Sequence, residues 1–467
     1  MTPFSLESVR GAVNAKAVNA AALDNSGGRE VFFTGVSTDS RTIKAGELFF
    51  ALKGDNFDAH GFMEDVSRIA AGAVVSRKVA STREGFIQIE VDDTLQALQR
   101  LAAHARGIRP LKVIAITGSN GKTTTKEMAA AVLAKKYTVL KTEGNLNNHI
   151  GLPLTLLRLG GTEDAAVLEM GASKAGDIAE LCEIAAPDIG ILTNIGPGHL
   201  EGFGSMEGVR AAKLELMDFL SAKTIIVNGD DDFLMEGVTQ KNKTLKKEII
   251  TIGIEKDADI SGRIITGMDT TALRAAIMFP NGQEIDVTIQ SGGAHNVYNA
   301  LSAAAAGYLM GVPREGISQA LCEFKGVAMR LEHREINGSM VICDFYNANP
   351  ASTANALKEL ARLKKDRAVA VLGDMLELGP HAEQYHRELG RWMAAQPVDL
   401  FIAVGPLMKM ACEEFKSARE ALGMHVNGSS VCAASAVEAG RMLKESMSGA
   451  TVLIKGSRGL KMERVLE

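Results

Sequence analysis

Short apolar runs alternate along the chain with stretches of helical periodicity, and this alternation predicts parallel strands joined by helices. The clearest instance spans residues 111–136. A dense apolar run at 111–116 predicts a buried strand, and residues 126–136, rich in Ala, Met and Leu and free of Pro and Gly, predict a helix. A glycine-containing turn at 117–125 joins the two. Strand, turn and helix in this order are typical of a phosphate-binding loop.

Residues 1–92 are predicted to form a small first α/β unit. Strands are expected at 31–36 and 47–52, where Phe, Val and Leu dominate. A polar loop follows each strand. Side chains of the kind found there either close a turn or bind a sugar or nucleotide, with the arginine available for a phosphate. The candidate residues of the two loops are Ser37, Asp39, Ser40, Arg41, Lys53 and His60.

Residues 93–325 are predicted to form a central α/β unit with a largely parallel sheet. A helix at 94–106 leads into it, and Pro110 ends that helix before the strand at 111–116. Further strands are expected at 138–140, 165–170, 188–194 and 224–228, and helices at 177–185 and 206–220.

Residues 326–467 alternate strand and helix once more, which predicts a third, Rossmann-like doubly wound unit. The first strand is not followed by G-x-G-x-x-G, so a dinucleotide site is not indicated. Polar clusters at 344–350 and 455–459 follow strands instead. Strands are expected at 340–344, 368–373, 400–405 and 451–454, and helices near 352–365, 381–395, 407–421 and 433–447.

Composition excludes several classes of protein. A chain of 467 residues with 46% hydrophobic and 23% charged residues is an ordinary globular protein with more than one core. A net charge of −5 does not provide the excess of positive charge that is typical of proteins that bind nucleic acid. No apolar stretch reaches membrane-spanning length, and the five scattered cysteines favour free thiols over disulfides or zinc. We therefore expect a cytoplasmic protein that neither binds nucleic acid nor inserts into a membrane.

The turn at 117–125 carries the strongest chemical signal. Its glycines let the backbone approach an anion, and the start of the following helix offers N–H groups with partial positive charge. A lysine can reach the terminal phosphates, and a threonine hydroxyl can bind Mg2+. Ile116 stands where the strict motif has its first glycine, so a plain surface turn is the alternative. The candidate residues are Gly118, Ser119, Asn120, Gly121, Lys122, Thr123 and Thr124.

Polar residues that follow strands of the central unit are further candidates, because ligands bind outside the carboxyl ends of parallel strands. Glu169 either holds Mg2+ or is merely exposed. His199 lies in a glycine-rich turn and is either functional or solvated, and periodicity places Lys213 on the surface of its helix. Several asparagines either close turns or bind a polar ligand. They are Asn145, Asn147, Asn148 and, at a helix start, Asn296.

Taken together, the motifs resemble those of the Mur ligase family, whose members extend the peptide of peptidoglycan precursors by ATP-driven amide formation. The resemblance covers nearly the whole chain, in three units in the family's order. It rests on the runs at 117–125, 169–172, 199–205 with Lys213, and 295–299. Within the family, the runs at 145–153, 344–350 and 373–379 are similar to those of the member that adds D-alanyl-D-alanine to a UDP-N-acetylmuramoyl-tripeptide. Residues 37–41 and 53–60 resemble its UDP-sugar-binding unit, with Ala59 where glycine is usual.

The resemblance implies ATP, two Mg2+ ions and a carbamate, formed from CO2, on Lys213. Thr123 and Glu169 would serve one Mg2+, and Glu169, His199 and the modified lysine the second. The implied catalytic residues are Lys122, Glu169, His199 and Lys213. Family contacts to the nucleotide match Asn296, Arg330 and Asp344, and Asn347 and Asn349 are candidates for the incoming dipeptide. The polar residues of the first unit and the asparagines at 145–148 would bind the other substrate.

Two other interpretations remain open. The chain is either a neighbouring family member, such as the enzyme that adds the third peptide residue or a folate polyglutamate ligase, or a nucleotide switch or motor that hydrolyses ATP without making amide bonds. The run at 344–350 argues against the first, and two further units with polar strand ends argue against the second. We expect a monomer whose partners are small molecules. Lysine and diaminopimelate both fit as the third residue of the tripeptide.

Overall fold

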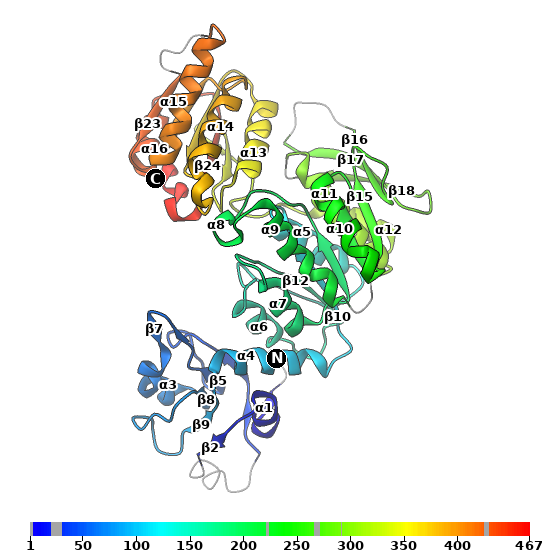
Figure 1. The fold of residues 1–467 in the computed structure, drawn as a ribbon, viewed down its shortest axis with the longest axis vertical. Coiled ribbons are helices and arrows are strands. Elements are labelled where there is room, and N and C mark those ends of the chain that lie inside the picture. The colour runs from blue at the N-terminus through cyan, green and yellow to red at the C-terminus, as the bar shows by residue number, and fades with distance from the viewer. Residues whose placement is uncertain (1–2, 20–29, 221–223, 266–270, 291, 425–428) are drawn as a thin grey trace.

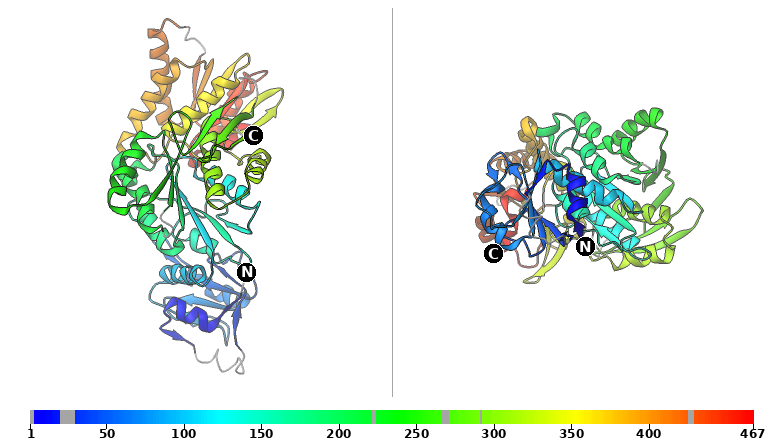
Figure 2. Two further views of the ribbon diagram at one scale, coloured as in Figure 1. Left: turned by 90° about the vertical axis from the view of Figure 1, so that its right-hand side faces the viewer. Right: turned by 90° about the horizontal axis from the view of Figure 1, so that it is seen from below.

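The computed structural model describes residues 3–19, 30–220, 224–265, 271–290, 292–424 and 429–467. Three units, each built on its own sheet, follow one another along the long axis of the molecule in chain order (Figure 1). The fold is α/β throughout, as predicted. The left-hand view of Figure 2 also shows the first unit at one end and the third at the other.

The first unit contains a five-stranded sheet in the order β2-β9-β8-β5-β4, parallel except for the edge strand β2. The single strand predicted at 31–36 is wrong. β3 pairs with β1, whereas β4 joins β5, because Thr34 between them bonds to Gly46 and redirects the chain. The elements are β1 (Phe4–Ser5), α1 (Leu6–Val13), β2 (Ala17–Val18), β3 (Phe32–Phe33), β4 (Gly35–Ser37), β5 (Glu47–Phe50), β6 (Lys53–Gly54), β7 (Phe57–Asp58), η1 (Ala59–Phe62), α3 (Met63–Ile69), β8 (Gly72–Val75) and β9 (Ile87–Glu90).

Helix α4 (Thr94–Gly107) connects the first unit to the central one, as predicted. Asp93 begins it, because its carboxylate accepts hydrogen bonds from the Leu95 and Gln96 amides at 2.8 and 3.0 Å. The buried face of α4 includes Leu98 and Leu101 and belongs to a core that continues from the first unit into the central one. The two units are therefore packed together through one helix.

The central unit is built on a nine-stranded sheet in the order β11-β12-β10-β13-β14-β15-β16-β17-β18. Pairing is parallel from β11 to β16 and antiparallel for β17 and β18, so the sheet is largely parallel, as predicted. The strands are β10 (Lys112–Thr117), β11 (Val139–Lys141), β12 (Ala165–Glu169), β13 (Ile189–Leu192), β14 (Thr224–Asn228), β15 (Glu248–Gly253), β16 (Ile260–Ile264), β17 (Leu273–Met278) and β18 (Glu284–Ile289).

Helices cover both faces of this sheet, so the alternate residues of β10 enter two different cores. Helix α5 begins at Lys122, not at the predicted 126. Its early threonines have low helix propensity, but the Thr125 hydroxyl donates to Asn299 Oδ1 at 3.1 Å and its amide bonds to Gly121. The helices are α5 (Lys122–Leu133), α6 (Gly151–Leu156), α7 (Asp177–Ala185), α8 (Leu200–Phe203), α9 (Met206–Leu214), η2 (Glu215–Phe219), α10 (Asp232–Leu245), α11 (His295–Leu309) and α12 (Arg314–Glu323).

The third unit contains a six-stranded sheet in the order β19-β20-β24-β21-β22-β23, with only the edge strand β19 antiparallel. Separate cores lie on its two faces, as expected of a doubly wound sheet. The elements are β19 (Glu332–Ile336), β20 (Ser339–Asp344), α13 (Pro350–Leu363), β21 (Ala368–Gly373), η3 (Gly379–His381), α14 (Ala382–Ala394), β22 (Leu400–Val404), α15 (Pro406–Ala421), β23 (Ser430–Ala433), α16 (Ala436–Lys444), β24 (Thr451–Lys455), η4 (Arg458–Leu460) and η5 (Met462–Leu466).

Candidate active site

The loop between β10 and α5 has a backbone that only glycine accommodates at two positions. Gly118 has φ +142°, and a Cβ there would lie 2.0 Å from Thr193 Oγ1. Gly121 has φ +82°, and a Cβ there would lie 2.5 Å from Asn299 Oδ1. Both positions are therefore closed to a side chain. This tight packing shapes the loop before any ligand arrives.

The loop is held from the neighbouring strand β13. Ser119 Oγ donates to the Gly196 carbonyl at 2.9 Å and accepts from the Gly196 amide at 2.8 Å. The Asn120 amide donates to Asn194 Oδ1 at 3.0 Å. The loops that follow two adjacent parallel strands thus form one rigid edge, as expected at the carboxyl end of such a sheet.

Lys122 begins α5 and bends back over the loop. Its Nζ donates to the carbonyls of Gly118 and Ser119 at 2.8 and 3.1 Å. Burial lowers the pKa of Lys122; Glu169 partly offsets this effect, and Arg330 adds to it. A cation set across a glycine loop at a helix start is the arrangement that binds a polyphosphate.

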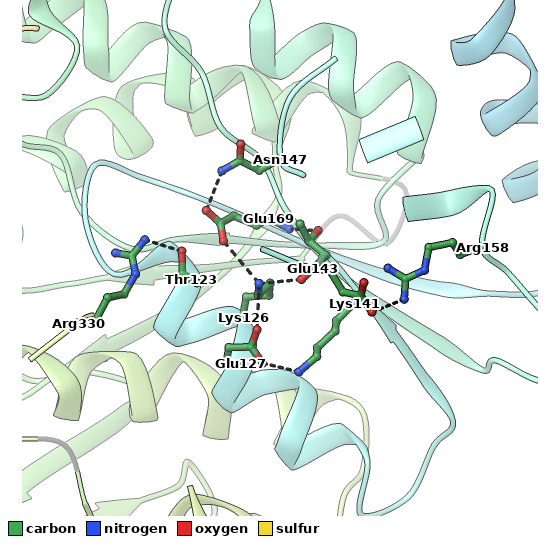
Figure 3. Close-up of polar contacts among 10 residues, drawn as sticks. Thr123, Lys126, Glu127, Lys141, Glu143, Asn147, Arg158, Glu169 and Arg330 are labelled. Carbon is green, nitrogen blue, oxygen red and sulfur yellow. Dashed lines mark hydrogen bonds and ion pairs between the residues drawn. The ribbon is translucent and has the colours of Figure 1, made fainter. Parts of the chain in front are cut away.

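Glu169 is the last residue of β12 and is only 3% exposed. Its Oε1 accepts from Asn147 Nδ2 at 2.9 Å (Figure 3). Among the described residues, its Oε2 has no hydrogen-bond partner, although it lies 3.9 Å from Lys126 Nζ. A buried carboxylate oxygen without a hydrogen bond is costly unless a cation completes it. Glu169 therefore fits the role of a Mg2+ ligand.

Thr123 meets a residue from the start of the third unit. Its Oγ1 accepts from Arg330 Nη2 at 2.9 Å (Figure 3). The Arg330 guanidinium also lies 4.1 Å from the centre of the Tyr346 ring, a cation–π contact. Arg330 thus reaches the first turn of α5, where a phosphate and its metal would bind.

Lys213 is buried, and its predicted surface position is wrong. It is only 2% exposed because Val209, Ala212 and Lys213 form the inward face of α9. Its Nζ donates to the Ala172 carbonyl at 3.4 Å. Burial, followed by the nearby Lys122, lowers its pKa to about 7, and two acidic neighbours partly offset the shift. A large fraction of this amine is therefore neutral at neutral pH.

His199 precedes the short helix α8 with φ +54°. Its Nδ1 lies 2.8 Å from Glu377 Oε2, an ion pair when the imidazole is protonated. Glu377 belongs to the third unit and has φ +65°. His199 therefore joins the central unit to the third.

The third unit contributes a second contact to the phosphate loop. Asn349 Nδ2 donates to Asn120 Oδ1 at 2.8 Å, and Asn349 also caps α13. Asp344, at the end of β20, forms an ion pair of 2.7 Å with Lys455. In the central unit, buried Asn296 donates to the Gly292 carbonyl at 2.6 Å.

One cleft of about 1620 Å³ brings most of the predicted residues together. Gly118 and Lys213 do not line it themselves, but each is hydrogen-bonded to a lining residue, Gly118 to Lys122 and Lys213 to Ala172. The predicted residues that line the cleft are Ser119, Asn120, Gly121, Lys122, Thr123, Thr124, Asn145, Asn147, Asn148, Glu169, His199, Asn296, Arg330, Asp344, Asn347 and Asn349.

The six candidates of the first unit do not line this cleft. Asp39 forms two hydrogen bonds with the Arg41 guanidinium, at 2.9 and 2.7 Å, and its pKa falls to about 2 through these bonds and the one from the Arg41 amide. Ser37 is bonded to the Asp39 backbone, and Ser40 lies in the same turn. His60 is buried, with Nδ1 2.6 Å from Asp58 and Nε2 accepting from the Ser76 amide at 3.0 Å. Lys53 is exposed.

Several residues at or near the cleft were not assigned a role from the sequence, among them Lys126, Tyr346, Glu377 and Lys455. Lys126 lies one helical turn beyond Lys122 and donates to the Thr142 carbonyl at 2.7 Å. Tyr346, Glu377 and Lys455 line the cleft from the third unit. All three fall within runs that the sequence analysis singled out. Lys126 and Lys455 each lie within an otherwise apolar helix or strand. Because a buried lysine needs a partner, that position was the sequence signal that could have identified them.

Two features are absent from the described residues, a protein-only metal cage and a membrane-spanning helix. Over the described ranges, no group of three or more His, Cys, Asp or Glu side chains is arranged to hold a metal ion. Mg2+ usually binds one or two carboxylates together with phosphate oxygens and does not need a complete set of protein ligands. Glu169 and Thr123 are therefore sufficient protein ligands for such an ion. Across the same part of the chain, no helix combines the length and apolar character that crossing a bilayer requires. All five cysteines are free.

Comparison with protein families matches most of the chain. Residues 116–307 match the Mur ligase middle domain, and residues 329–458 match the Mur ligase, glutamate ligase domain. The UDP-N-acetylmuramoyl-tripeptide--D-alanyl-D-alanine ligase of Bacillus subtilis is 36% identical over 93% of this chain and 92% of its own length. That of Escherichia coli is 35% identical over 94% of both chains.

Solved structures agree. A crystal structure of MurF from Acinetobacter baumannii is similar with a TM-score of 0.87 and 31% identity, covering 100% of this chain and 98% of its own. MurF ligase from Thermotoga maritima in complex with ADP is similar with a TM-score of 0.79 and 27% identity, covering 92% and 96%. The similarity extends over all three units.

Proposed function

Because the chain belongs to the Mur ligase family, we propose that it is an ATP-dependent ligase that joins D-alanyl-D-alanine to a UDP-N-acetylmuramoyl-tripeptide in peptidoglycan precursor synthesis. The supporting observation is that the phosphate loop, Glu169, His199 and residues of the third unit line one cleft. Relatives more than 30% identical over nine-tenths of their length bear the name of this activity.

We assign one ligand to each unit. Residues 1–92 bind the UDP-muramoyl part of the tripeptide substrate, residues 93–325 bind ATP, and residues 326–467 receive the dipeptide. The cleft lies between the second and third of these, where Arg330 and Asn349 contact the phosphate loop. That is where a γ-phosphate, a carboxylate and an amine have to meet.

The reaction begins with phosphoryl transfer. A carboxylate oxygen of the tripeptide attacks the γ-phosphorus, the bond from that phosphorus to the bridging oxygen breaks, and ADP leaves. Lys122 and Arg330 stabilise the negative charge that spreads over the transferring group. Nζ of Lys122 exchanges its two loop carbonyls, 2.8 and 3.1 Å away, for phosphate oxygens.

Amide formation follows. The free amine of D-alanyl-D-alanine attacks the carbonyl carbon of the acyl phosphate and loses a proton, and the tetrahedral intermediate collapses as the C–O bond to phosphate breaks. Asn347 and Asn349 orient the dipeptide in this scheme. Closure of the third unit over the loop excludes water, which would otherwise hydrolyse the acyl phosphate.

Two Mg2+ ions would be held by Thr123 and Glu169, and by Glu169, His199 and modified Lys213. When bound, Mg2+ screens the repulsion between ATP and the substrate carboxylate. The Glu169 oxygen without a hydrogen-bond partner supports the first of these sites.

Lys213 fits a carbamate for two reasons. Its lowered pKa of about 7 leaves much of the amine neutral, the form that attacks CO2 to give a carbamate and a proton. The nearby positive charge of Lys122, which disfavours an ammonium at this position, favours an anion there.

The cytoplasm is our proposed place of reaction and a monomer our proposed active form. Free cysteines suit a reducing compartment.

Phosphate release measured with each combination of substrates tests the function. The ligase should release phosphate from ATP only when UDP-N-acetylmuramoyl-tripeptide and D-alanyl-D-alanine are both present, with one amide formed per phosphate. A nucleotide switch would hydrolyse ATP with neither substrate. Activity with glutamate or a diamino acid in place of the dipeptide would indicate another member of the family. Comparing tripeptides that end in lysine and in diaminopimelate then identifies the third residue.

A further inference from the structure

Lys455 is a buried lysine that joins the two ends of the cleft-lining segment 344–347. It ends β24 and lies opposite Asp344 in the parallel pairing with β20. Its Nζ donates to Asp344 Oδ2 at 2.7 Å and to the Asn347 carbonyl at 2.9 Å, and only 2% of its side chain is exposed. A buried ammonium is tolerated where it is paired and hydrogen-bonded, so these two contacts fix its position.

The chain that Lys455 anchors then reaches the phosphate loop at two points. Tyr346 stacks on Arg330, whose guanidinium lies 4.1 Å from the ring centre and donates to Thr123. Asn349, two residues after the Lys455 contact, donates to Asn120 at 2.8 Å. The path of residues 344–349 therefore sets how the third unit meets the loop.

We propose that Lys455 is a positioning residue for the ligation reaction. It holds residues 344–349 in the shape in which Asp344 faces the nucleotide and Asn347 the dipeptide. This inference rests on the proposed function, because it takes those two roles from it. Lys455 acts through Asp344, so its contribution to nucleotide binding disappears when Asp344 cannot pair with it.

The chain offers a control pair outside the cleft. Lys364 and Asp399, also in the third unit, form an ion pair of the same 2.7 Å length, although their side chains are more exposed, at 22% and 40%, and neither residue lines the cleft. Lys455→Met and Lys364→Met each remove one ammonium from such a pair. The dissociation constant of a non-hydrolysable ATP analogue is measured by titration calorimetry for both variants and the parent chain.

We expect roughly tenfold weaker analogue binding in Lys455→Met, the effect of losing one charge-assisted hydrogen bond from the site, and no change in Lys364→Met. The KM for D-alanyl-D-alanine should rise more than kcat falls. In an Asp344→Asn background, Lys455→Met should weaken binding by less than about twofold further. Binding within twofold of the parent in the single variant, or a full tenfold loss in both backgrounds, would overturn the proposal.

A second variant separates positioning from folding. Lys455→Gln removes the charge but keeps an N–H donor, one bond closer to the backbone, and an uncharged polar group in place of the ammonium, so it should fold and show the same loss of binding. If both Lys455 variants are unfolded while Lys364→Met is folded, the residue is a determinant of the fold and the proposal is wrong. A parent chain that neither binds the analogue nor forms amide would instead contradict the proposed function.

Discussion

Arg330 Nη2 donates a 2.9 Å hydrogen bond to Thr123 Oγ1, although the two residues are 207 positions apart in the chain. This bond links the segment that enters the third unit to the first turn of the phosphate-loop helix. The Arg330 guanidinium also lies over the Tyr346 ring. The position of the third unit is thus coupled directly to the atoms that would hold ATP.

Arg330→Ala should lower kcat/KM for ATP by roughly 10²–10³-fold, because a cation that stabilises the transferring phosphoryl group is lost. Arg330→Lys should recover little, since an ammonium replaces neither the planar stacking nor the fork geometry. Steady-state kinetics with varied ATP measure both. Arg334, paired with Glu332 outside the cleft, is the control, and its alanine variant should behave as the parent. Equal losses in both alanine variants would show that general charge matters rather than the site.

Lys122→Ala should reduce turnover by about 10³-fold or more, because the cation over the phosphate loop is lost. Phosphate release under saturating substrates measures this. Lys112→Ala is the control, since that exposed lysine is on the strand leading to the loop and pairs with Asp188. Retained activity in Lys122→Ala would remove the loop from the mechanism.

Lys213→Ala should cripple the enzyme, and a small added carboxylate should restore part of the activity by taking the place of the carbamate. The labelled carbamate is followed directly by ¹³C NMR in the parent chain. Protonation removes the reactive amine, so the signal should be weak about one pH unit below the pKa of about 7 and strong about one unit above it. Wild-type activity in Lys213→Ala, or no carbamate signal at either pH, would contradict the modification.

Leu101→Ala should lower the free energy of unfolding by about 2–5 kcal/mol, because it opens a cavity in the core shared by the first and central units. Urea unfolding measures the loss. Arg100→Ala changes the exposed face of the same helix and should stay within about 0.5 kcal/mol of the parent. A similar loss in both variants would contradict the packing explanation; helix propensity cannot cause either loss, because alanine is the strongest helix former.

The elements predicted best are those in which apolar runs have clear ends. Strand β14 and helix α7 have the predicted bounds, because a turn at Gly229 and Asp230 follows β14, and Gly176 and Ala186 in left-handed backbone flank α7. Strands β15 to β18 were missed. Most residues of β15, β16 and β18 are exposed or half-buried, and Arg274 interrupts the buried residues of β17, so none of the four has the dense apolar run of a central strand.

The site was predictable where chemistry follows a strand and unpredictable where it depends on packing between units. Glu169 and the phosphate loop follow neighbouring parallel strands, so topology alone places them together. Lys213 was misjudged because periodicity identifies the faces of a helix without saying how far the neighbours cover them. The contact of Asn349 with Asn120 spans two units, and no pattern within either segment encodes it.

Helix α4 has a consequence for how the chain can be divided. Its leucines are buried in a core that the first and central units share, so cutting the polypeptide on either side of residue 94 would leave an exposed apolar surface on one of the fragments. A fragment that carries the central unit alone would need those leucines replaced by polar residues, so the first and central units depend on the same helix for their stability.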